Sequence, residues 1–477
     1  MSDKTCSTPN DGDSRRQLPA MTTLLETPEI AALLARHPRA RVVAALRRAL
    51  DIERTRVSAS GGAPTSDAVV KTVVDAIADR ERERLRPVIN ATGIILHTGL
   101  GRAVLPRAAA EALAQLDRCC NLQLDLGNGR RGKRNYETEQ LLCELTGAEA
   151  AMVVNNNAAA TLLMLAALCA GEEVVVSRGQ LIEIGGSYRL PDCIHQSGAR
   201  LVEVGTTNKT HLRDYAAAIN ENTAALLRVN PSNYRIVGFT ADVSVAELAT
   251  LKQGSDLLLI DDLGCGVLIG LERFGLDHEP TAGESIAAGA DLVCFSGDKL
   301  IGGPQAGIIV GRADLIQHIR SHPLTRMLRV DKCADIALEH TLRLFLDPDT
   351  LPKTNPTYAM LAAPLDALHR RAQGIRRRVN RAGARISLRI VEGESALGGG
   401  SLPATPIKTW CIAITVPGHS AEALAAHLRR HEPPVIARIA GDAVVLDMRT
   451  LLPGEDRVCA DALVAICPEN KTPDTPS

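Results

Sequence analysis

Short β-branched runs alternate with Ala- and Leu-rich segments through the middle of this 477-residue chain. Such alternation is typical of strands separated by helices, and it predicts a mostly parallel sheet with helices on both faces. The runs are AAMVVNN (150–156), EEVVVSR (172–178), RLVEVG (200–205), AALLRVN (224–230), DLLLIDD (256–262), DLVCFSG (291–297) and AGIIVG (306–311). In folds of this class the chemistry lies at the carboxyl ends of the strands.

Polar side chains gather at those predicted strand ends. They are Asn155 to Asn157, Arg178, Thr206 to Asn208, Asn230, Asp261, Asp262 and Asp298. The sequence therefore places a candidate site at one edge of the predicted sheet.

The length and composition of the chain limit the number of domains and the kinds of molecule that it could bind. A chain of 477 residues with 45% hydrophobic content exceeds one ordinary core, so two or three domains are expected. Lys and Arg number 54 against 55 Asp and Glu, so the summed charge attracts neither DNA nor an anionic membrane, and a polyanion would need a local basic patch. Aromatic residues make up 2% of the chain, which argues against a base-stacking platform.

The start of the chain is polar, and no later apolar run is long enough to span a bilayer, so we expect a cytoplasmic protein. The 12 cysteines include the adjacent pair Cys119 and Cys120 but no C-x-x-C spacing. Reduced thiols and no metal site are the expectation.

The domain plan has five parts. We expect a disordered start (1–17), a helical domain (18–86), a large domain (87–350), a small α/β domain (351–467) and a disordered tail (468–477). Helical patterns cover 28–56, 67–86 and 331–345. In the small domain, strands at 435–440 and 443–448 form a hairpin through Gly441 and Asp442.

Lys299 in CFSGDKLIGGPQAG (294–307) follows a predicted strand and precedes a glycine-rich turn. Ser296 to Lys299 reads S-x-x-K, but the S-D-N and K-T-G companions of serine acyl enzymes are missing. A Walker loop would need G-K-S or G-K-T, and DLGCGVLIG (262–270) has the wrong spacing for a dinucleotide site.

Pyridoxal phosphate is the remaining candidate, because its chemistry requires a Schiff-base lysine, an acid at the pyridine nitrogen and a phosphate cradle. Lys299 supplies the first, and Asp261, at the end of a buried run, supplies the second. Asn157, Ala158 and Ala159 open a predicted helix whose free N–H groups would bind the phosphate, and Ser296 adds a hydroxyl. Each residue has an ordinary structural role when taken singly, but together they favour a cofactor site.

Several motifs carry a family resemblance over nearly the whole chain. They are INATGIILHTGLGRA (89–103), RRGKR (130–134), VVNNNAAA (153–160), SRGQLIEIGGSYRLPD (177–192), VGTTNKTH (204–211), LLIDDLGCG (258–266), FSGDKLIGGPQAGIIVG (295–311), HPLTRMLRVDK (322–332), GGGSLP (398–403) and PPVIARI (433–439). With these motifs the chain resembles the bacterial selenocysteine synthases, L-seryl-tRNA(Sec) selenium transferases.

The resemblance implies a fold-type-I pyridoxal phosphate enzyme with an aspartate-aminotransferase-like large domain. It also implies conversion of seryl-tRNA(Sec) to selenocysteinyl-tRNA(Sec) with selenophosphate, by β-elimination of the seryl hydroxyl to dehydroalanyl-tRNA and addition of selenium. A homo-oligomer built as a ring of dimers, a decamer, and tRNA binding by the N-terminal domain are further implications.

Carried over motif by motif, Lys299 is the Schiff-base lysine and Asp298 the candidate acid. Further residues are implied in substrate binding: Arg102, Arg131 or Arg134 in the active site, and Arg326 and Arg329 at the phosphate of the selenium donor. Gln180 and Cys265 depart from the family pattern, where we expect glutamate and serine.

An arginine-rich helix face lies in the N-terminal region. Its members are Arg39, Arg41, Arg47, Arg48 and Arg54. Such faces are usually only solvated, but the resemblance favours a tRNA contact. The alternatives are a small-molecule pyridoxal phosphate lyase or ammonia-lyase of the same superfamily, and a tRNA-binding protein with an inactive enzyme fold.

Overall fold

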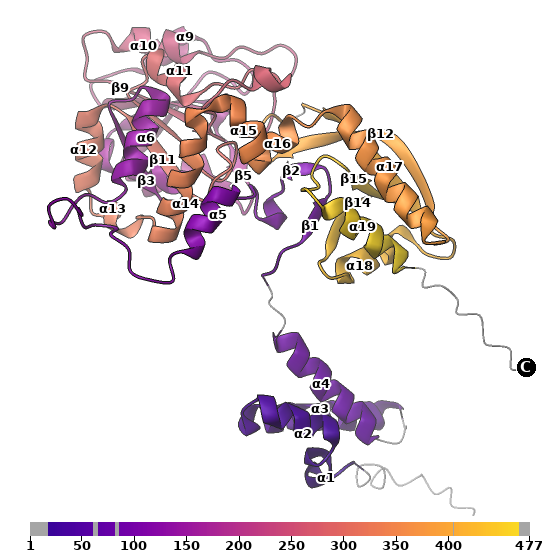
Figure 1. Ribbon diagram of the computed structural model, residues 1–477. Helices are drawn as coiled ribbons and strands as arrows, with labels where there is room; N and C mark the ends of the chain where they lie inside the picture. The colour runs from indigo at the N-terminus through magenta and orange to yellow at the C-terminus, as the bar shows by residue number, and fades with distance from the viewer. Residues whose placement is uncertain (1–17, 61–64, 82–84, 404, 467–477) are drawn as a thin grey trace, which may run out of the picture. The chain divides into compact units, whose positions relative to one another are not determined.

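A computed structural model describes residues 18–466 except 61–64, 82–84 and 404 (Figure 1). The predicted disordered segments, 1–17 and 468–477, lie outside the described residues. The chain divides into two compact units, residues 1–87 and 88–477. The predicted boundary near residue 350 stays a prediction.

The first unit is helical. Its helices are α1 (Met21–Leu25), α2 (Pro28–Arg36), α3 (Arg39–Ser60) and α4 (Ser66–Glu81). The helical pattern over 28–56 is interrupted, because His37 before Pro38 is extended, with φ −130° and ψ 151°. Leu46 of α3 and Val73 of α4 are fully buried in the small core of this unit.

The second unit contains a seven-stranded sheet in the order β3-β11-β10-β9-β8-β4-β7. The strands are β3 (Ala150–Val154), β4 (Glu173–Ser177), β7 (Arg200–Val204), β8 (Thr223–Val229), β9 (Leu258–Gly264), β10 (Leu292–Ser296) and β11 (Gly307–Gly311). Strand β11 runs antiparallel to both neighbours, and the other pairs are parallel. The predicted α/β class with a mostly parallel sheet is confirmed.

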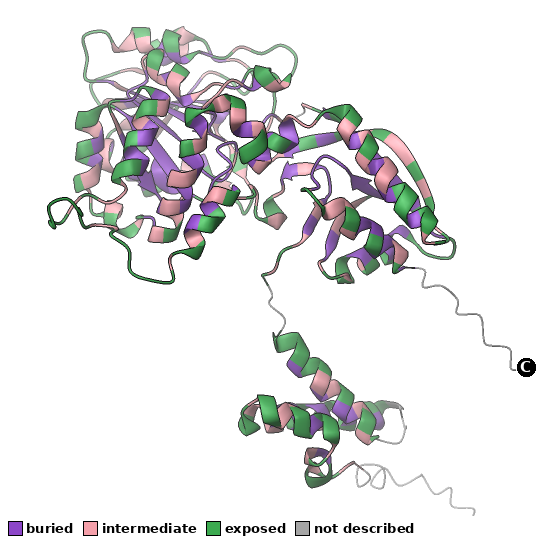
Figure 2. Ribbon diagram, in the orientation of Figure 1, coloured by how far each residue is buried: buried purple, intermediate pink, exposed green. Residues whose placement is uncertain are grey.

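Helices cover both faces of this sheet, whose strands are buried between them (Figure 2). One face packs against α7 (Asn157–Leu168), α8 (Leu190–Gln196) and α12 (Ala313–Ser321). The other packs against α6 (Tyr136–Thr146), α10 (Val245–Ala249), α11 (Ala282–Ala287) and α14 (Lys332–Leu342). The remaining helices before residue 362 are α5 (Arg107–Ala114), α9 (Leu212–Ala218), α13 (Leu324–Met327), α15 (Leu351–Thr354) and α16 (Pro356–Leu361), and a small hairpin pairs β5 (Glu183–Ile184) with β6 (Tyr188–Arg189).

A second, six-stranded sheet has the order β1-β14-β15-β13-β12-β2. Its strands are β1 (Ile89–Ala91), β2 (Ile94–Leu96), β12 (Ser387–Gly398), β13 (Ile407–Thr415), β14 (Val435–Ala440) and β15 (Ala443–Asp447). Helices α17 (Leu365–Arg381), α18 (Ala421–Arg430) and α19 (Glu455–Val464) share a core with it. The hairpin through Gly441 is present, and strands from the start of the unit complete the sheet. Among the described residues, no helix is long and apolar enough to cross a membrane.

Candidate active site

Lys299 lies in the turn that follows β10. Gly297 N donates to the Ala306 carbonyl at 2.9 Å, and Gly302 N donates to the Lys299 carbonyl at 2.9 Å, so the turn is held by backbone bonds at both ends. The Lys299 amine makes no hydrogen bond or ion pair with any described residue, although its charge partly offsets the burial that raises the pKa values of Asp262 and Cys265. The turn therefore presents a lysine whose amine is free to react.

Glycine at position 307 brings this turn close to the start of α7. A Cβ there would come within 2.0 Å of the Asn156 carbonyl oxygen, a contact that no side chain tolerates. At Gly297, a Cβ would meet the Pro304 carbonyl at 2.9 Å. These glycines allow close approach of backbone segments, so the lysine turn and the start of α7 stay adjacent.

Helix α7 begins as the sequence predicts. The Asn156 side chain caps it by accepting from Ala159 N at 2.9 Å, and its dipole presents a partial positive charge at this end. Asn157 Oδ1 is buried and has no hydrogen-bond partner in the described structure. Ser296 ends β10, is buried, and its hydroxyl makes no hydrogen bond among the described residues. The first turn of α7 is thus a cradle suited to an anion.

Two adjacent carboxylates of β9 face opposite sides of the sheet, as alternation along a strand requires. Asp261, fully buried, accepts from Arg228 Nη1 at 2.9 Å and from the Ser285 hydroxyl at 2.6 Å, on the side of α11. Asp262 accepts from Asn157 Nδ2 at 2.8 Å and from the Thr161 hydroxyl at 2.9 Å, on the side of α7.

Burial raises the pKa of Asp262, whereas the bonds from Asn157 and Thr161 and the charge of Lys299 act in the opposite direction. The role predicted for Asp261 stays a prediction, and its neighbour Asp262 is the carboxylate that shares a sheet face with the cradle. The sequence places Asp262 at a strand end but gives it no role. Because side chains alternate along a strand, Asp261 and Asp262 must point to opposite faces of the sheet.

Asp298, beside the lysine, forms an ion pair with Arg102. Arg102 Nη1 donates to Asp298 Oδ2 at 2.7 Å, and both side chains are largely shielded from solvent. Arg102 has φ 61°, in the left-handed region, directly after Gly101 in the same region. This backbone turn directs the chain after β2 towards the lysine, so two of the implied residues meet.

The other arginines that the resemblance implies in substrate binding lie in two other segments of the chain. Arg329 is exposed and forms an isolated β-bridge with Val154, the last residue of β3, while Arg326 lies in α13. Neither guanidinium has a hydrogen bond or ion pair within the described residues. Arg131 donates to Gln123 at 3.3 Å in its own loop, and Arg134 has a buried Nε without a partner. No such contact joins Arg131 or Arg134 to Lys299 in the described part of the chain.

Three further residues near the lysine were not assigned a role from the sequence. Cys265 donates to Glu279 Oε1 at 3.2 Å, and Asn230 Nδ2 donates to the same oxygen at 2.8 Å. Burial and the Glu279 carboxylate raise the pKa of Cys265 well above its ordinary value, so the thiol stays protonated. Glu279 follows no predicted strand, and only the folded chain brings it to this edge.

The residues present fit pyridoxal phosphate. A free lysine amine, a buried carboxylate on the same face, an amide oxygen without a partner and a positive helix end meet the needs of its aldehyde, ring and phosphate. The solved structure of D-glucosaminate-6-phosphate ammonia-lyase matches 80% of this chain and 96% of its own, with TM-score 0.55 and 23% identity. The chain has the fold of the fold-type-I pyridoxal phosphate enzymes.

Sequence comparisons are more specific than the fold. The family described as L-seryl-tRNA selenium transferase matches residues 88–452, and the one described as selenocysteine synthase N terminal matches 15–54. The L-seryl-tRNA(Sec) selenium transferase of Moorella thermoacetica is 48% identical over 94% of this chain and 96% of its own length. That of Hyphomonas neptunium is 46% identical over 93% and 97%. This chain belongs to the L-seryl-tRNA selenium transferase family.

Proposed function

We propose that this chain converts L-seryl-tRNA(Sec) to L-selenocysteinyl-tRNA(Sec), with selenophosphate as the selenium donor. The match to named transferases over both units carries the proposal. The free amine of Lys299, next to an anion cradle and a buried carboxylate, supports it. Action in the cytoplasm and assembly as a ring of dimers remain predictions.

We assign pyridoxal phosphate to the sheet edge at Lys299. The first N–H groups of α7, at Asn157 and Ala158, and the Ser296 hydroxyl would hold its phosphate. Ala159, also predicted from the sequence, would contribute through its place in the first turn, because its N–H already donates to Asn156. A carboxylate of β9 holds the proton of its ring nitrogen: the sequence predicts Asp261, and the placement of Asp262 beside Asn157 favours Asp262. When bound, the cofactor supplies a ring that accepts electrons from the α-carbon of the seryl group.

The chain's own groups move the protons. The Lys299 amine, without a partner in the described structure, removes the proton from the seryl α-carbon. Hydroxide is a poor leaving group, so the β-hydroxyl needs an acid. We assign that role to Asp298, which Arg102 orients from 2.7 Å and which acts once it has taken up a proton and this ion pair has opened. The β-carbon of the resulting dehydroalanyl-tRNA then bonds to the selenium of selenophosphate, and Lys299 returns the proton to the α-carbon. The P–Se bond breaks as water takes the phosphoryl group, which leaves as phosphate.

The arginines bind the donor. A planar guanidinium meets phosphate oxygens with two parallel hydrogen bonds, so exposed arginines without partners suit selenophosphate. We assign Arg326 and Arg329 to its phosphate, and Arg102 to substrate binding beside Asp298. Arg131 and Arg134 are assigned to substrate binding, and the structure adds no contact of theirs to the lysine turn.

Purified protein, seryl-tRNA(Sec) and selenophosphate test the proposal. Formation of selenocysteinyl-tRNA(Sec) is expected, with no product from free serine and none from Lys299→Ala, which should also lose the visible absorbance of the bound cofactor. Turnover of free serine without turnover of seryl-tRNA(Sec) would instead identify a small-molecule lyase, and normal turnover by Lys299→Ala would remove the lysine from the mechanism.

A further inference from the structure

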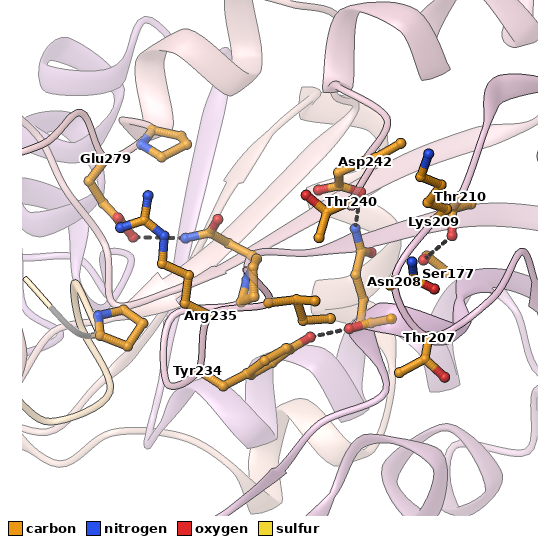
Figure 3. A pocket seen from close by; sticks show the side chains of 18 of the residues that line it. Ser177, Thr207, Asn208, Lys209, Thr210, Tyr234, Arg235, Thr240, Asp242 and Glu279 are labelled. Carbon is orange, nitrogen blue, oxygen red and sulfur yellow. Dashed lines mark hydrogen bonds between the residues drawn. The ribbon is translucent and has the colours of Figure 1, made fainter. Parts of the chain in front are cut away.

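A cavity of about 390 Å³ opens at the carboxyl ends of β4 and β8 (Figure 3). Its walls include Ser177 and Asn230 at the strand ends, the segment 206–210 after β7, and Tyr234, Arg235 and Asp242 from the segment after β8. A volume of this size lies in the lower part of the range found for small-molecule sites. Neither the lysine turn nor the cradle of α7 lines it, so the cavity adjoins the lysine site without overlapping it.

The inner wall of this cavity is shared with the lysine turn. Glu279, which lines the cavity, accepts from Cys265 at 3.2 Å, and the Cys265 carbonyl accepts from Leu300 N at 3.4 Å. Asn230, another wall residue, donates its backbone N–H to the carbonyl of Asp262 at 2.8 Å. The wall therefore contacts Asp262 directly through Asn230, and it is linked to the lysine turn through Cys265 and Leu300.

Charge argues against a phosphate in the cavity. Three lining carboxylates, those of Asp242, Asp277 and Glu279, face two lining cations, Lys209 and Arg235. Lys209 Nζ lies 2.8 Å from the centroid of the exposed Phe239 ring, and Arg235 Nη1 lies 3.9 Å from Asp277. A site with a surplus of carboxylates and with cations already paired fits a neutral polar ligand better than an anion.

The opposite wall offers one aromatic face and one aligned carboxylate. The Tyr234 hydroxyl donates to the Gly179 carbonyl, which fixes the orientation of the ring at the cavity floor (Figure 3). Gln180 Nε2 donates to Asp242 Oδ1 at 3.0 Å, while Gln180 Oε1 accepts from Val229 N at 3.0 Å. The family resemblance predicts glutamate at position 180, and glutamate has no N–H to donate here. Glutamine holds one oxygen of Asp242 and leaves Oδ2 without a partner among the described residues.

We propose that this cavity binds the 3′-terminal adenosine of the aminoacyl-tRNA, with the base on the Tyr234 ring and its exocyclic amine donating to Asp242 Oδ2. This inference rests on the proposed function. The seryl group is esterified to the ribose of that nucleoside, so any pose that brings the seryl α-carbon to Lys299 puts the nucleoside within one ester linkage of it. Aromatic stacking and hydrogen bonds to base edges are how proteins bind unpaired nucleotides.

A hydrolysis-resistant probe tests the cavity: 3′-deoxy-3′-(L-serylamido)adenosine, titrated calorimetrically into the cofactor-loaded full chain. Its guanosine counterpart places a carbonyl where adenine has the amine, opposite an Asp242 oxygen that only accepts. We expect the adenosine probe to bind at least about tenfold more tightly than the guanosine probe. Asp242→Asn keeps an acceptor for Gln180 and should weaken adenosine binding by about tenfold, as should Tyr234→Ala, which removes a stacking surface.

Arg213→Ala, on an exposed residue of α9 outside the cavity walls, is the matched control and should bind the probe as the unmodified chain does. The visible absorbance of each variant and its thermal midpoint show whether the cofactor site and the fold are intact. Failure of the unmodified chain to bind the probe, equal binding of both nucleosides, or unchanged binding by a folded Asp242→Asn would each overturn the proposal. Tight, Asp242-dependent binding without turnover of seryl-tRNA(Sec) would leave the cavity assigned and overturn the proposed reaction.

Discussion

Two buried aspartates, one in each sheet of the second unit, are both hydrogen-bonded, but the polar groups around them are satisfied to different degrees. Asp447, at the end of β15, accepts from Thr409 at 2.8 Å, from Ser395 at 3.1 Å, from Arg438 Nη1 at 3.1 Å and from Arg449 N at 3.0 Å. Asp262, near the carboxyl end of β9 in the other sheet, accepts from Asn157, Thr161 and Gly264 N, but the Lys299 amine near it and the Asn157 Oδ1 have no partner among the described residues.

We propose that this difference separates a structural cluster from a reactive one. In the Asp447 cluster, donors from Ser395, Thr409, Arg438 and Arg449 converge on one carboxylate, which is how buried charges are stabilised. Around Lys299 the polar groups are only partly satisfied, and unsatisfied buried groups mark positions where a ligand is expected. Three sets of substitutions test whether polar groups without partners mark a functional cluster and fully partnered groups a structural one.

The largest effect is expected for Asp262→Asn. Removing the charge that faces the cradle should lower turnover of seryl-tRNA(Sec) by about a hundredfold or more and change the visible absorbance of the bound cofactor. Asp261→Asn is the matched variant one residue away, and its main expected effect is a lower thermal midpoint, because it weakens the bond to Arg228. A large loss of turnover and altered absorbance in Asp261→Asn alone would restore the assignment made from the sequence.

Asp447→Asn should act on stability instead. It leaves Arg438 with an uncompensated charge in a half-buried position and should lower the free energy of unfolding by about 2–4 kcal/mol. Denaturant unfolding followed by circular dichroism measures this change. The absorbance of the bound cofactor should be unaltered in the folded variant, and a changed spectrum with unchanged stability would contradict the structural role.

The smallest effect is expected for the arginines of α3, where we again compare side chains without a partner with one that has a partner. Arg47 and Arg48 are exposed and have no ion pair in the described structure, whereas Arg54 is paired with Asp51. If the face binds tRNA, Arg47→Ala with Arg48→Ala should weaken tRNA affinity several-fold and reduce the slope of binding against salt by about two units. Arg54→Ala should change affinity less, and equal effects of the two variants would show that pairing does not matter there.

Much of this arrangement follows from local patterns in the sequence. The seven strands, the hairpin at Gly441 and the start of α7 at Asn157 are signalled by residue type and spacing, and all are present. The reversal of β11 is not signalled, because a five-residue apolar run reads the same in either direction. The entry of β1 and β2 into the second sheet depends on pairings more than 290 positions apart in the sequence, such as Ile94 with Ala396.

The candidate site was predictable in its lysine and cradle but not in its second carboxylate. Alternation along β9 shows that Asp261 and Asp262 point to opposite faces, but it does not say which face carries the cofactor. The proposed assignment to the face of Asp262 rests on α7, whose Asn157 and Thr161 donate to Asp262 and not to Asp261. The position of Glu279 and the cavity were likewise not predictable, because loops that lie far apart in the sequence form them only in the folded chain.

The segment after β1 connects the two sheets of the second unit. At one end, Thr450 accepts from Gly93 N at 3.1 Å and Arg438 donates to the Thr92 carbonyl at 2.7 Å, so residues around Asp447 hold the segment in place. Nine residues beyond Gly93, at the other end of the segment, Arg102 donates to Asp298. A chain of nine residues spans at most about 30 Å, so it is a short covalent link between the two sheets. A shift of the second sheet would therefore be transmitted to the guanidinium paired with Asp298, the neighbour of Lys299.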